Sequence, residues 1–169
     1  IMTTLTFDIR PAQKRDCEAI ANVHEKAWQY AYAGIIPHKS LSNMIARRGP
    51  QWWQRTICGS NAVLVADIGG KVAGYATVGR NRTAQLAQKG EIYELYIRPE
   101  YQGLGFGGQL FAAARARCAN FSLRGTVVWA LEENINAIGF YEAMGGLDVA
   151  EGTESFENKI LKKIAFVWN

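Results

Sequence analysis

The sequence predicts a single α/β domain over residues 1–169, with a mixed sheet of about six or seven strands and helices on both faces. Two strand-like runs, 62–68 and 71–78, are joined by Gly69-Gly70, a dipeptide typical of tight antiparallel hairpins. Between residues 91 and 131 a strand-like run, a helix-like run and an apolar run follow one another, as in a right-handed parallel crossover. The length of 169 residues and the hydrophobic content of 49% suit one core.

The first predicted strand and helix open the chain. Residues 6–10 alternate as a short strand does, and Arg10-Pro11 ends it. The stretch that follows, through Tyr30, has apolar residues at helical spacing. Asp16 is its expected N-cap, because a short acidic side chain can accept a hydrogen bond from the first turn.

Two further helices precede the hairpin. Residues 37–48 predict a helix, and Gly49-Pro50 separates it from a short aromatic helix with Trp52 and Trp53. After the hairpin, the polar residues 80–90 predict a loop that leads into the next strand.

The second half continues the alternation of helices and strands. The alanine-rich composition and the spacing of apolar residues support the first of its helices. The predicted elements are a helix at 109–120, a strand at 126–131, a helix at 134–143 and one or two strands at 155–167.

Composition narrows the compartment and the partners. No run of about 18 apolar residues occurs and no leader-like segment opens the chain, so we expect a soluble, cytoplasmic protein with no membrane partner. The net charge of +4 is spread without a dense basic stripe, so we expect no nucleic-acid partner. Cys17, Cys58 and Cys118 are scattered, and we expect reduced thiols. His24 and His38 have no partner at ligand spacing, so we expect no metal.

A glycine-rich loop at 102–108 is the most informative motif. Four glycines in six positions lie between a strand-like and a helix-like run. Glycine lets the backbone approach a ligand closely, and the free N–H groups of a helix start attract anions. The expected ligand therefore carries phosphate.

Spacing weighs three phosphate-binding motifs against one another. A nucleoside-triphosphate loop needs Lys and Ser/Thr after its last glycine, but Gln109 and Leu110 follow Gly108. The G-x-G-x-x-G pattern of dinucleotide-binding folds is present, so an NAD(P)-binding enzyme is an alternative. Against it, five residues separate the strand from the first glycine, and the strand carries Glu91 and Glu94.

Three segments resemble the GNAT acetyltransferase superfamily. Gln102-Gly-Leu-Gly105-Phe-Gly107 is similar to the family's Gln/Arg-x-x-Gly-x-Gly/Ala signature, which binds the pyrophosphate of acetyl-coenzyme A. Residues 91–99 resemble its fourth strand, and 134–145 its Asn-x-x-Ala-x-x-Phe-Tyr-Glu segment. A weaker match is 28–37. The resemblance covers about a third of the chain and implies the GNAT-like acyltransferase fold, with acetyl-coenzyme A as donor and an amine of a small molecule, protein or peptide as acceptor.

The resemblance implies an acid and a base. Glu91 occupies the position of the catalytic glutamate in histone-acetylating members, with Glu94 or an ordered water as the alternative base. A salt bridge at the solvent end of the strand is an equal interpretation for Glu91. The two lie three residues apart, so a regular strand points them to opposite faces unless a bulge intervenes. Tyr141 resembles the tyrosine that protonates the leaving sulfur, although core packing is its alternative role.

The resemblance also implies the residues that hold the cofactor. The fourth and fifth strands of the family splay apart, leaving the main chain of one of them free to pair with pantetheine. Asn134 resembles an asparagine near the pantetheine arm, although it is equally a helix N-cap. The expected cofactor-binding residues are Leu95, Tyr96, Ile97, Gln102, Gly103, Leu104, Gly105, Phe106, Gly107, Gly108, Asn134 and, more weakly, Asn136.

Aromatic residues are the candidates for acceptor binding. Trp28, Tyr32 and Tyr93, with Trp52 and Trp53, are suited to wall a pocket, although most such residues are core. The prediction is an N-acetyltransferase that acts by direct attack in a ternary complex. A non-catalytic coenzyme A sensor of the same fold is the alternative, and the sequence leaves the acceptor and the oligomeric state, a homodimer included, open.

Overall fold

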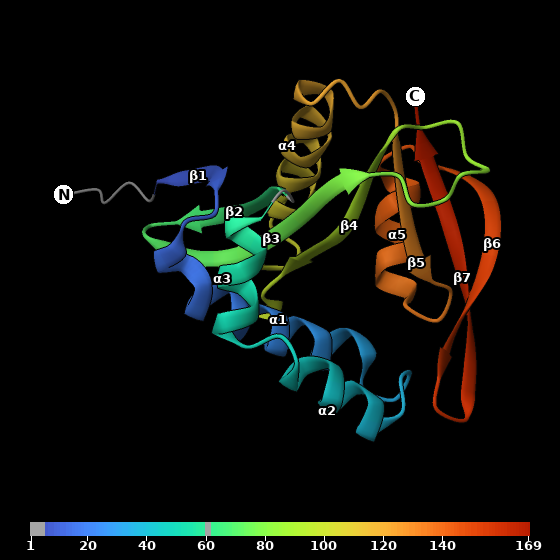
Figure 1. The fold of residues 1–169 in the computed structure, drawn as a ribbon, viewed down its shortest axis with the longest axis horizontal. Coiled ribbons are helices and arrows are strands. Elements are labelled where there is room, and N and C mark those ends of the chain that lie inside the picture. Colours follow the sequence, from blue (N-terminus) through green and yellow to red (C-terminus); the bar gives the residue numbers. More distant parts are fainter. Residues whose placement is uncertain (1–5, 60–61) are drawn as a thin grey trace.

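The computed structural model describes residues 6–59 and 62–169 and folds them around one seven-stranded sheet (Figure 1). The strands are β1 (Phe7–Pro11), β2 (Ala62–Ile68), β3 (Lys71–Arg80), β4 (Gly90–Ile97), β5 (Thr126–Leu131), β6 (Leu147–Phe156) and β7 (Lys159–Trp168). The helices are α1 (Cys17–Tyr32), α2 (His38–Ala46), α3 (Pro50–Cys58), α4 (Phe106–Asn120) and α5 (Ile135–Ala143), with short 3-10 helices η1 (Lys14–Asp16) and η2 (Pro99–Tyr101).

The sheet is mixed, and its one parallel pair among the described strands is β4 with β5. The strand order is β1-β2-β3-β4-β5-β7-β6. β4 and β5 pair over two positions only, Gly90 with Thr126 and Glu91 with Val127. From Ile92 onward the two strands separate, which leaves the facing main chain of β4 without a partner strand.

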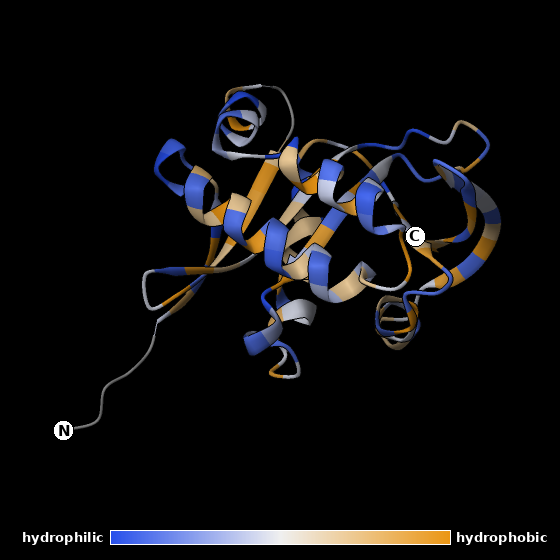
Figure 2. Ribbon diagram, turned by 90° about the horizontal axis from the view of Figure 1, so that it is seen from below, coloured by the Kyte–Doolittle hydropathy of each residue, from blue (hydrophilic) through white to orange (hydrophobic). Residues whose placement is uncertain are grey.

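Helices cover both faces of the sheet. α4 and α5 pack on one face, where their buried residues meet Ile92, Val128 and Phe166. α1 and α3 pack on the other face against β2 and β3, and α1 and α2 enclose a neighbouring cluster with Leu131 and Leu161. Figure 2 shows hydrophilic residues alternating with hydrophobic ones along the helices, while the strands behind them are mostly hydrophobic. The alternation follows from burial of one side of each helix.

Most predicted elements are present with small shifts in their ends. The hairpin of β2 and β3 turns at Gly69-Gly70, where both glycines have positive φ. The fold class, a mixed sheet with helices on both faces, is confirmed.

Three local predictions differ from the structure. The C-terminal strands were expected from residue 155, yet β6 begins at Leu147; it is an edge strand, mostly exposed, and shows no apolar alternation. α4 begins at Phe106 rather than residue 109, so two glycines lie in its first turn. Asp16 is the N-cap residue of α1, as predicted, but its side chain does not cap the helix, because its carboxylate accepts from the Gln13 N–H at 2.7 Å and pairs with Arg10.

Candidate active site

A cavity of about 840 Å³ lies beside the part of β4 that has separated from β5. The glycine-rich loop, the end of β4, α5 and the second half of α1 enclose it. Its lining includes Ala27, Tyr30, Ala31, Ile35, Leu95, Tyr96, Ile97, Gln102, Gly103, Gly105, Gly107, Gly108, Glu133, Asn134, Ile135, Asn136, Ala137, Phe140, Tyr141 and Met144. One cavity therefore joins a free strand edge to a helix start.

The loop at one end of the cavity is built to hold an anion. Gly103 and Gly105 have φ of +78° and +86°, a conformation that glycine adopts without strain, and nothing lies within 4 Å of a Cβ built on either. The first helical N–H with an acceptor four residues back is that of Gln109, at 3.3 Å from the Gly105 carbonyl. The preceding N–H groups of the first turn remain available to a ligand, as at any helix start. These residues fit the pyrophosphate of acetyl-coenzyme A.

Leu104 and Phe106 lie in this loop, but neither residue is part of the cavity lining. Leu104 is 61% exposed, and the Phe106 ring stacks on Phe7 with centroids 4.9 Å apart. Only their main-chain groups are available to a cofactor. The Gln102 side chain donates to the Ile97 carbonyl at 3.2 Å and so fixes the loop to the end of β4.

Tyr141 lines the cavity from α5 and is 6% exposed. Burial raises the pKa of its hydroxyl well above the usual value for tyrosine, so the group is protonated at neutral pH. Its hydroxyl makes no hydrogen bond to any residue that the structure describes, which leaves its proton available. Asn134 has the N-cap role considered for it, accepting from the Ala137 N–H at 3.4 Å, and it lines the cavity as well, as does Asn136.

Glu91 lies outside the cavity, where β4 and β5 are still paired. The residue is 1% exposed, and its carboxylate accepts from the Arg82 main-chain N–H at 3.0 Å and pairs with the Arg82 guanidinium at 2.8 Å. This geometry supports the salt-bridge interpretation. Tyr93 lies beside it, with its hydroxyl donating to the Arg80 carbonyl at 2.6 Å and Arg82 4.1 Å above its ring, so it faces this ion pair rather than the cavity.

A bulge in β4 decides where Glu94 points. Ile92 pairs with Val78 and Glu94 with Thr77, which leaves Tyr93 without a partner. Because Val78 and Thr77 are consecutive, Glu94 points to the face opposite Ile92, and hence to the face of α1 and α3. Glu91 and Glu94 therefore share a face, as the sequence allowed only with a bulge.

Glu94 lies in a cluster of aromatic residues. Its carboxylate pairs with Arg48 and accepts from the Tyr75 hydroxyl at 3.1 Å and the Thr77 hydroxyl at 3.4 Å. The Arg48 guanidinium lies over the rings of Trp28, at 5.5 Å, and Trp52, at 4.5 Å. Two of the predicted acceptor-binding aromatics, Trp28 and Trp52, are thus beside Glu94.

Tyr96 connects this cluster to the cavity. Tyr96 lines the cavity, and its ring lies 5.6 Å from that of Trp28 and 5.9 Å from that of Tyr75, centroid to centroid. Its hydroxyl shares a 2.5 Å hydrogen bond with that of Tyr32. Burial raises the pKa of both hydroxyls, so both stay protonated. Glu94 itself is not part of the cavity lining, but it contacts Tyr75, whose ring packs beside that of Tyr96.

Several buried polar atoms of the cluster have no partner among the described residues. They are both ring nitrogens of His24 and the indole nitrogens of Trp28 and Trp53. The rings of His24 and Trp28 are 4.6 Å apart, and that of Trp53 is 6.0 Å from His24. A buried polar group without a hydrogen bond lowers the stability of the folded state. Such groups are therefore typical of a place where a ligand or an ordered water completes the hydrogen bonds.

The buried His24 leads us to predict that the free energy of unfolding falls in acid. Burial, with Arg48 nearby, lowers its pKa to about 3. The folded state keeps the ring neutral, while the unfolded chain takes up a proton below about pH 6.5. Full stability is therefore present above that pH and falls as pH drops toward 3, by about 3 kcal/mol at pH 4. Urea unfolding between pH 8 and 4 should show a much smaller slope for His24→Phe.

His38→Gln is the matched control for this experiment, because His38 is exposed and should leave the pH slope as in the native protein. An unchanged slope in His24→Phe would contradict a neutral, buried His24.

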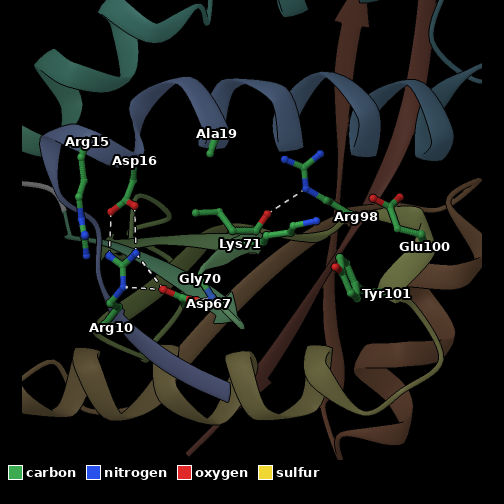
Figure 3. A pocket seen from close by; sticks show the side chains of 11 residues that line it. Arg10, Arg15, Asp16, Ala19, Asp67, Gly70, Lys71, Arg98, Glu100 and Tyr101 are labelled. Atoms are coloured by element: carbon green, nitrogen blue, oxygen red, sulfur yellow. Dashed lines mark hydrogen bonds and ion pairs between the residues drawn. The ribbon is translucent and has the colours of Figure 1, made fainter. Parts of the chain in front are cut away.

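A second cavity, of about 620 Å³, lies between the start of α1, the β2–β3 hairpin and η2. Figure 3 shows Arg10 between the carboxylates of Asp16 and Asp67. The hydrogen bonds to Arg10 lower the pKa of Asp16 below its ordinary value. Arg98 donates to the Val72 carbonyl and to the Asn22 side chain, so the four charged side chains Arg10, Asp16, Asp67 and Arg98 of this cavity already have partners.

The sequence did not identify several residues around the site. Arg48 lies in a turn after α2, and only its position in space places it at Glu94. No feature of the sequence distinguishes Tyr75 and His24 from ordinary core residues. The contributions of Ala27, Ala31 and Phe140 to the cavity wall likewise depend on the packing of α1 and α5.

Neither a metal cluster nor a membrane span occurs in the described part of the chain. Residues 6–59 and 62–169 hold no group of three or more His, Cys, Asp or Glu side chains arranged for a metal. No helix among them has both the length and the apolar character to cross a bilayer.

Comparison with known proteins gives one consistent result. The acetyltransferase (GNAT) family model matches residues 19–146. The uncharacterized N-acetyltransferase YuaI of Bacillus subtilis is 32% identical over 162 residues, which are 95% of this chain and 91% of YuaI. The L-amino acid N-acyltransferase MnaT of Escherichia coli is 32% identical over 63% of this chain and 59% of its own length.

A solved structure agrees in fold. The PaiA N-acetyltransferase of Thermoplasma acidophilum, in complex with coenzyme A, has a TM-score of 0.75 to this chain at 19% identity. The match covers 94% of this chain and 98% of that one. At this level of identity the likeness establishes the shared fold.

Proposed function

The chain belongs to the acetyltransferase (GNAT) family and is an N-acetyltransferase with acetyl-coenzyme A as its donor; we propose that the acetyl group passes directly to a primary amine in a ternary complex. One observation carries the proposal: a single cavity joins the anion-binding loop to the unpaired edge of β4. The dinucleotide alternative is wrong, because that fold needs a mostly parallel sheet and β4–β5 is the one parallel pair of the described strands.

The cavity supplies the groups that hold the donor. The N–H groups at the start of α4 and the macrodipole behind them bind the pyrophosphate. The main chain of Leu95, Tyr96 and Ile97 pairs with the pantetheine amides as an added strand would. When bound, acetyl-coenzyme A supplies an activated acyl group. All three cysteines lie outside the cavity lining, which supports direct transfer over an acyl-cysteine.

We assign the base to Glu94 rather than Glu91. An acceptor amine is mostly protonated at neutral pH, because the pKa of a free α-amine is about 8 and that of a lysine side chain about 10.4, so a base must take its proton. Glu94 lies beside Tyr96, which lines the cavity, whereas Glu91 lies where β4 is still paired with β5 and is held by Arg82. The main-chain donors of β4 beyond the bulge stabilise the carbonyl oxygen as its charge develops.

Tyr141 donates the proton that the departing thiolate needs. Tyr141→Phe is expected to lower kcat by roughly 10² to 10⁴-fold, because it removes the general acid and keeps the ring in place. The dissociation constant of coenzyme A, measured by calorimetry, should change less than about threefold, since no ground-state contact is lost. Unchanged kcat in a folded Tyr141→Phe variant would remove Tyr141 from this role.

Calorimetry with coenzyme A tests the proposed site most simply. Saturable binding to one site per chain, accompanied by a rise in melting temperature, is the expected result. Absence of binding would contradict the assignment of the cavity. The cytoplasmic location and a homodimer stay predictions, which cell fractionation and light scattering test.

A further inference from the structure

We propose that the acceptor is a primary amine that also carries a carboxylate, an α-amino acid being the simplest case, and that Arg48 and Glu94 recognise its two charges. The inference rests on the proposed acetyl transfer and names the class of acceptor for that same site. It depends on the ion pair beside the cavity and on the aromatic rings around it.

The Arg48–Glu94 pair is withdrawn from water. The side chains are 28% and 11% exposed, respectively. Glu94 also accepts from the Tyr75 and Thr77 hydroxyls, so it is fixed in place on β4. Arg48 instead follows α2 in a turn, with Gly49 after it, and its remaining N–H groups point to no acceptor among the described residues. The structure thus pairs a fixed carboxylate with a guanidinium that has unused donors.

The rings around Arg48 favour a ligand that leaves the guanidinium where it is. Its contacts with the faces of Trp28 and Trp52 stabilise a cation, more so when the pair is desolvated. A simple ammonium would have to take Arg48's place at Glu94 and forfeit those contacts. A zwitterion brings its own carboxylate to Arg48 while its ammonium takes Glu94, so every charge keeps a counter-charge.

A second observation points to an acceptor-rich ligand. The Trp28 indole N–H is a donor only; it is buried and, although the Tyr75 hydroxyl lies near it, makes no hydrogen bond of normal geometry to a described residue. The two ring nitrogens of the adjacent His24 also lack partners among the described residues. Because the Arg48 guanidinium lies 5.5 Å from the centroid of the Trp28 ring, a carboxylate bound to Arg48 would bring hydrogen-bond acceptors into the neighbourhood of these atoms. Planar guanidinium groups suit carboxylates because they bind them with two parallel hydrogen bonds.

The reaction itself is unchanged by this assignment. The amine nitrogen forms a bond to the acetyl carbonyl carbon, and the bond from that carbon to the coenzyme A sulfur breaks. Glu94 takes one proton from the ammonium before the attack, and the second proton leaves the nitrogen for water as the amide forms. The thiolate takes a proton from Tyr141 and leaves as coenzyme A, after which Tyr141 regains a proton from water and Glu94 releases its own. Arg48 touches the acceptor and takes no part in proton transfer.

Matched acceptors with and without the carboxylate test the inference. L-Phenylalanine against 2-phenylethylamine and L-methionine against 3-(methylthio)propylamine differ only in that group. The native protein should favour each amino acid by roughly 10- to 100-fold in kcat/KM, the range for a hydrogen-bonded charge pair. Arg48→Gln should lose most of this preference, through a higher KM of the amino acid. Arg48→Lys should keep part of it.

Arg47→Gln is the control, since Arg47 is exposed and contacts only its own helix, and it should keep the full preference. Melting temperature and acetyl-coenzyme A affinity show that each variant is folded. Plain amines used by the native protein as well as amino acids, or an unchanged KM for the amino acid in Arg48→Gln, would overturn the inference. If neither class of acceptor releases coenzyme A, the proposed function fails instead.

Discussion

Replacing Gly105 with aspartate is expected to abolish binding of coenzyme A and acetyl-coenzyme A. Gly105 is the N-cap of α4 and has φ of +86°, and a Cβ built there meets nothing within 4 Å. A carboxylate at this position faces the place of the pyrophosphate and also neutralises the positive end of the helix dipole. Like charges at contact distance in a partly shielded site repel by several kcal/mol, so the dissociation constant should rise at least about a hundredfold.

Gly105→Asn separates the effect of charge from that of shape. Asparagine has the size of aspartate and tolerates positive φ to a similar degree, yet it carries no charge. Isothermal calorimetry should show a much smaller loss of affinity for Gly105→Asn than for Gly105→Asp, with similar melting temperatures. Equal losses would mean that the loop does not hold an anionic group at Gly105.

Glu94→Gln is expected to lower kcat by roughly 10² to 10⁴-fold, the range for removal of a general base. Glutamine fits the same space beside Tyr75 and Thr77 but cannot take the proton of the acceptor amine. The deficit should shrink as pH rises toward the pKa of the amine, about 8 to 10.4, because more of the acceptor then arrives neutral. Steady-state kinetics from pH 7 to 10 measure this.

Glu91→Gln provides the contrast, because it changes a carboxylate on the same face of the same strand. It weakens the ion pair between the buried Glu91 carboxylate and the exposed Arg82 side chain and is expected to lower the free energy of unfolding by about 1–3 kcal/mol. Its kcat should stay within about threefold of the native value, since the side chain lies outside the cavity. A larger loss of kcat in Glu91→Gln than in Glu94→Gln would reverse the assignment of the base.

The sequence predicts those parts of the fold in which local chemistry determines local structure. Gly69-Gly70 favours a tight turn, and the apolar run of β5 favours a buried strand. The loop at 102–108 can bind an anion through its own backbone, whatever surrounds it in the fold. The first half of β6 could not be predicted in this way, because an edge strand with both faces largely exposed has no apolar periodicity. The missing side-chain cap of α1 could not be predicted either, because the Asp16 carboxylate accepts from the Gln13 N–H and not from the first turn of α1.

The candidate site could be predicted only where the chain itself brings residues together. The loop, Asn134 and Tyr141 follow a motif order along the sequence, and the structure places all of them around one cavity. Glu94 and Arg48 lie 46 residues apart, and their contact depends on a one-residue bulge at Tyr93 and on how the turn after α2 packs against α1. Neither the bulge nor the packing of this turn has a signal in the local sequence.

Product analysis of a single reaction tests the central claim most directly. The protein is mixed with acetyl-coenzyme A and a panel of primary amines, and the free thiol and the acetylated amine are quantified together. We predict thiol release that depends on the amine, with one N-acetylated product formed per coenzyme A, and none with Gly105→Asp. Binding of coenzyme A without amine-dependent release across the panel would contradict catalysis and identify a coenzyme A-binding module of the same fold.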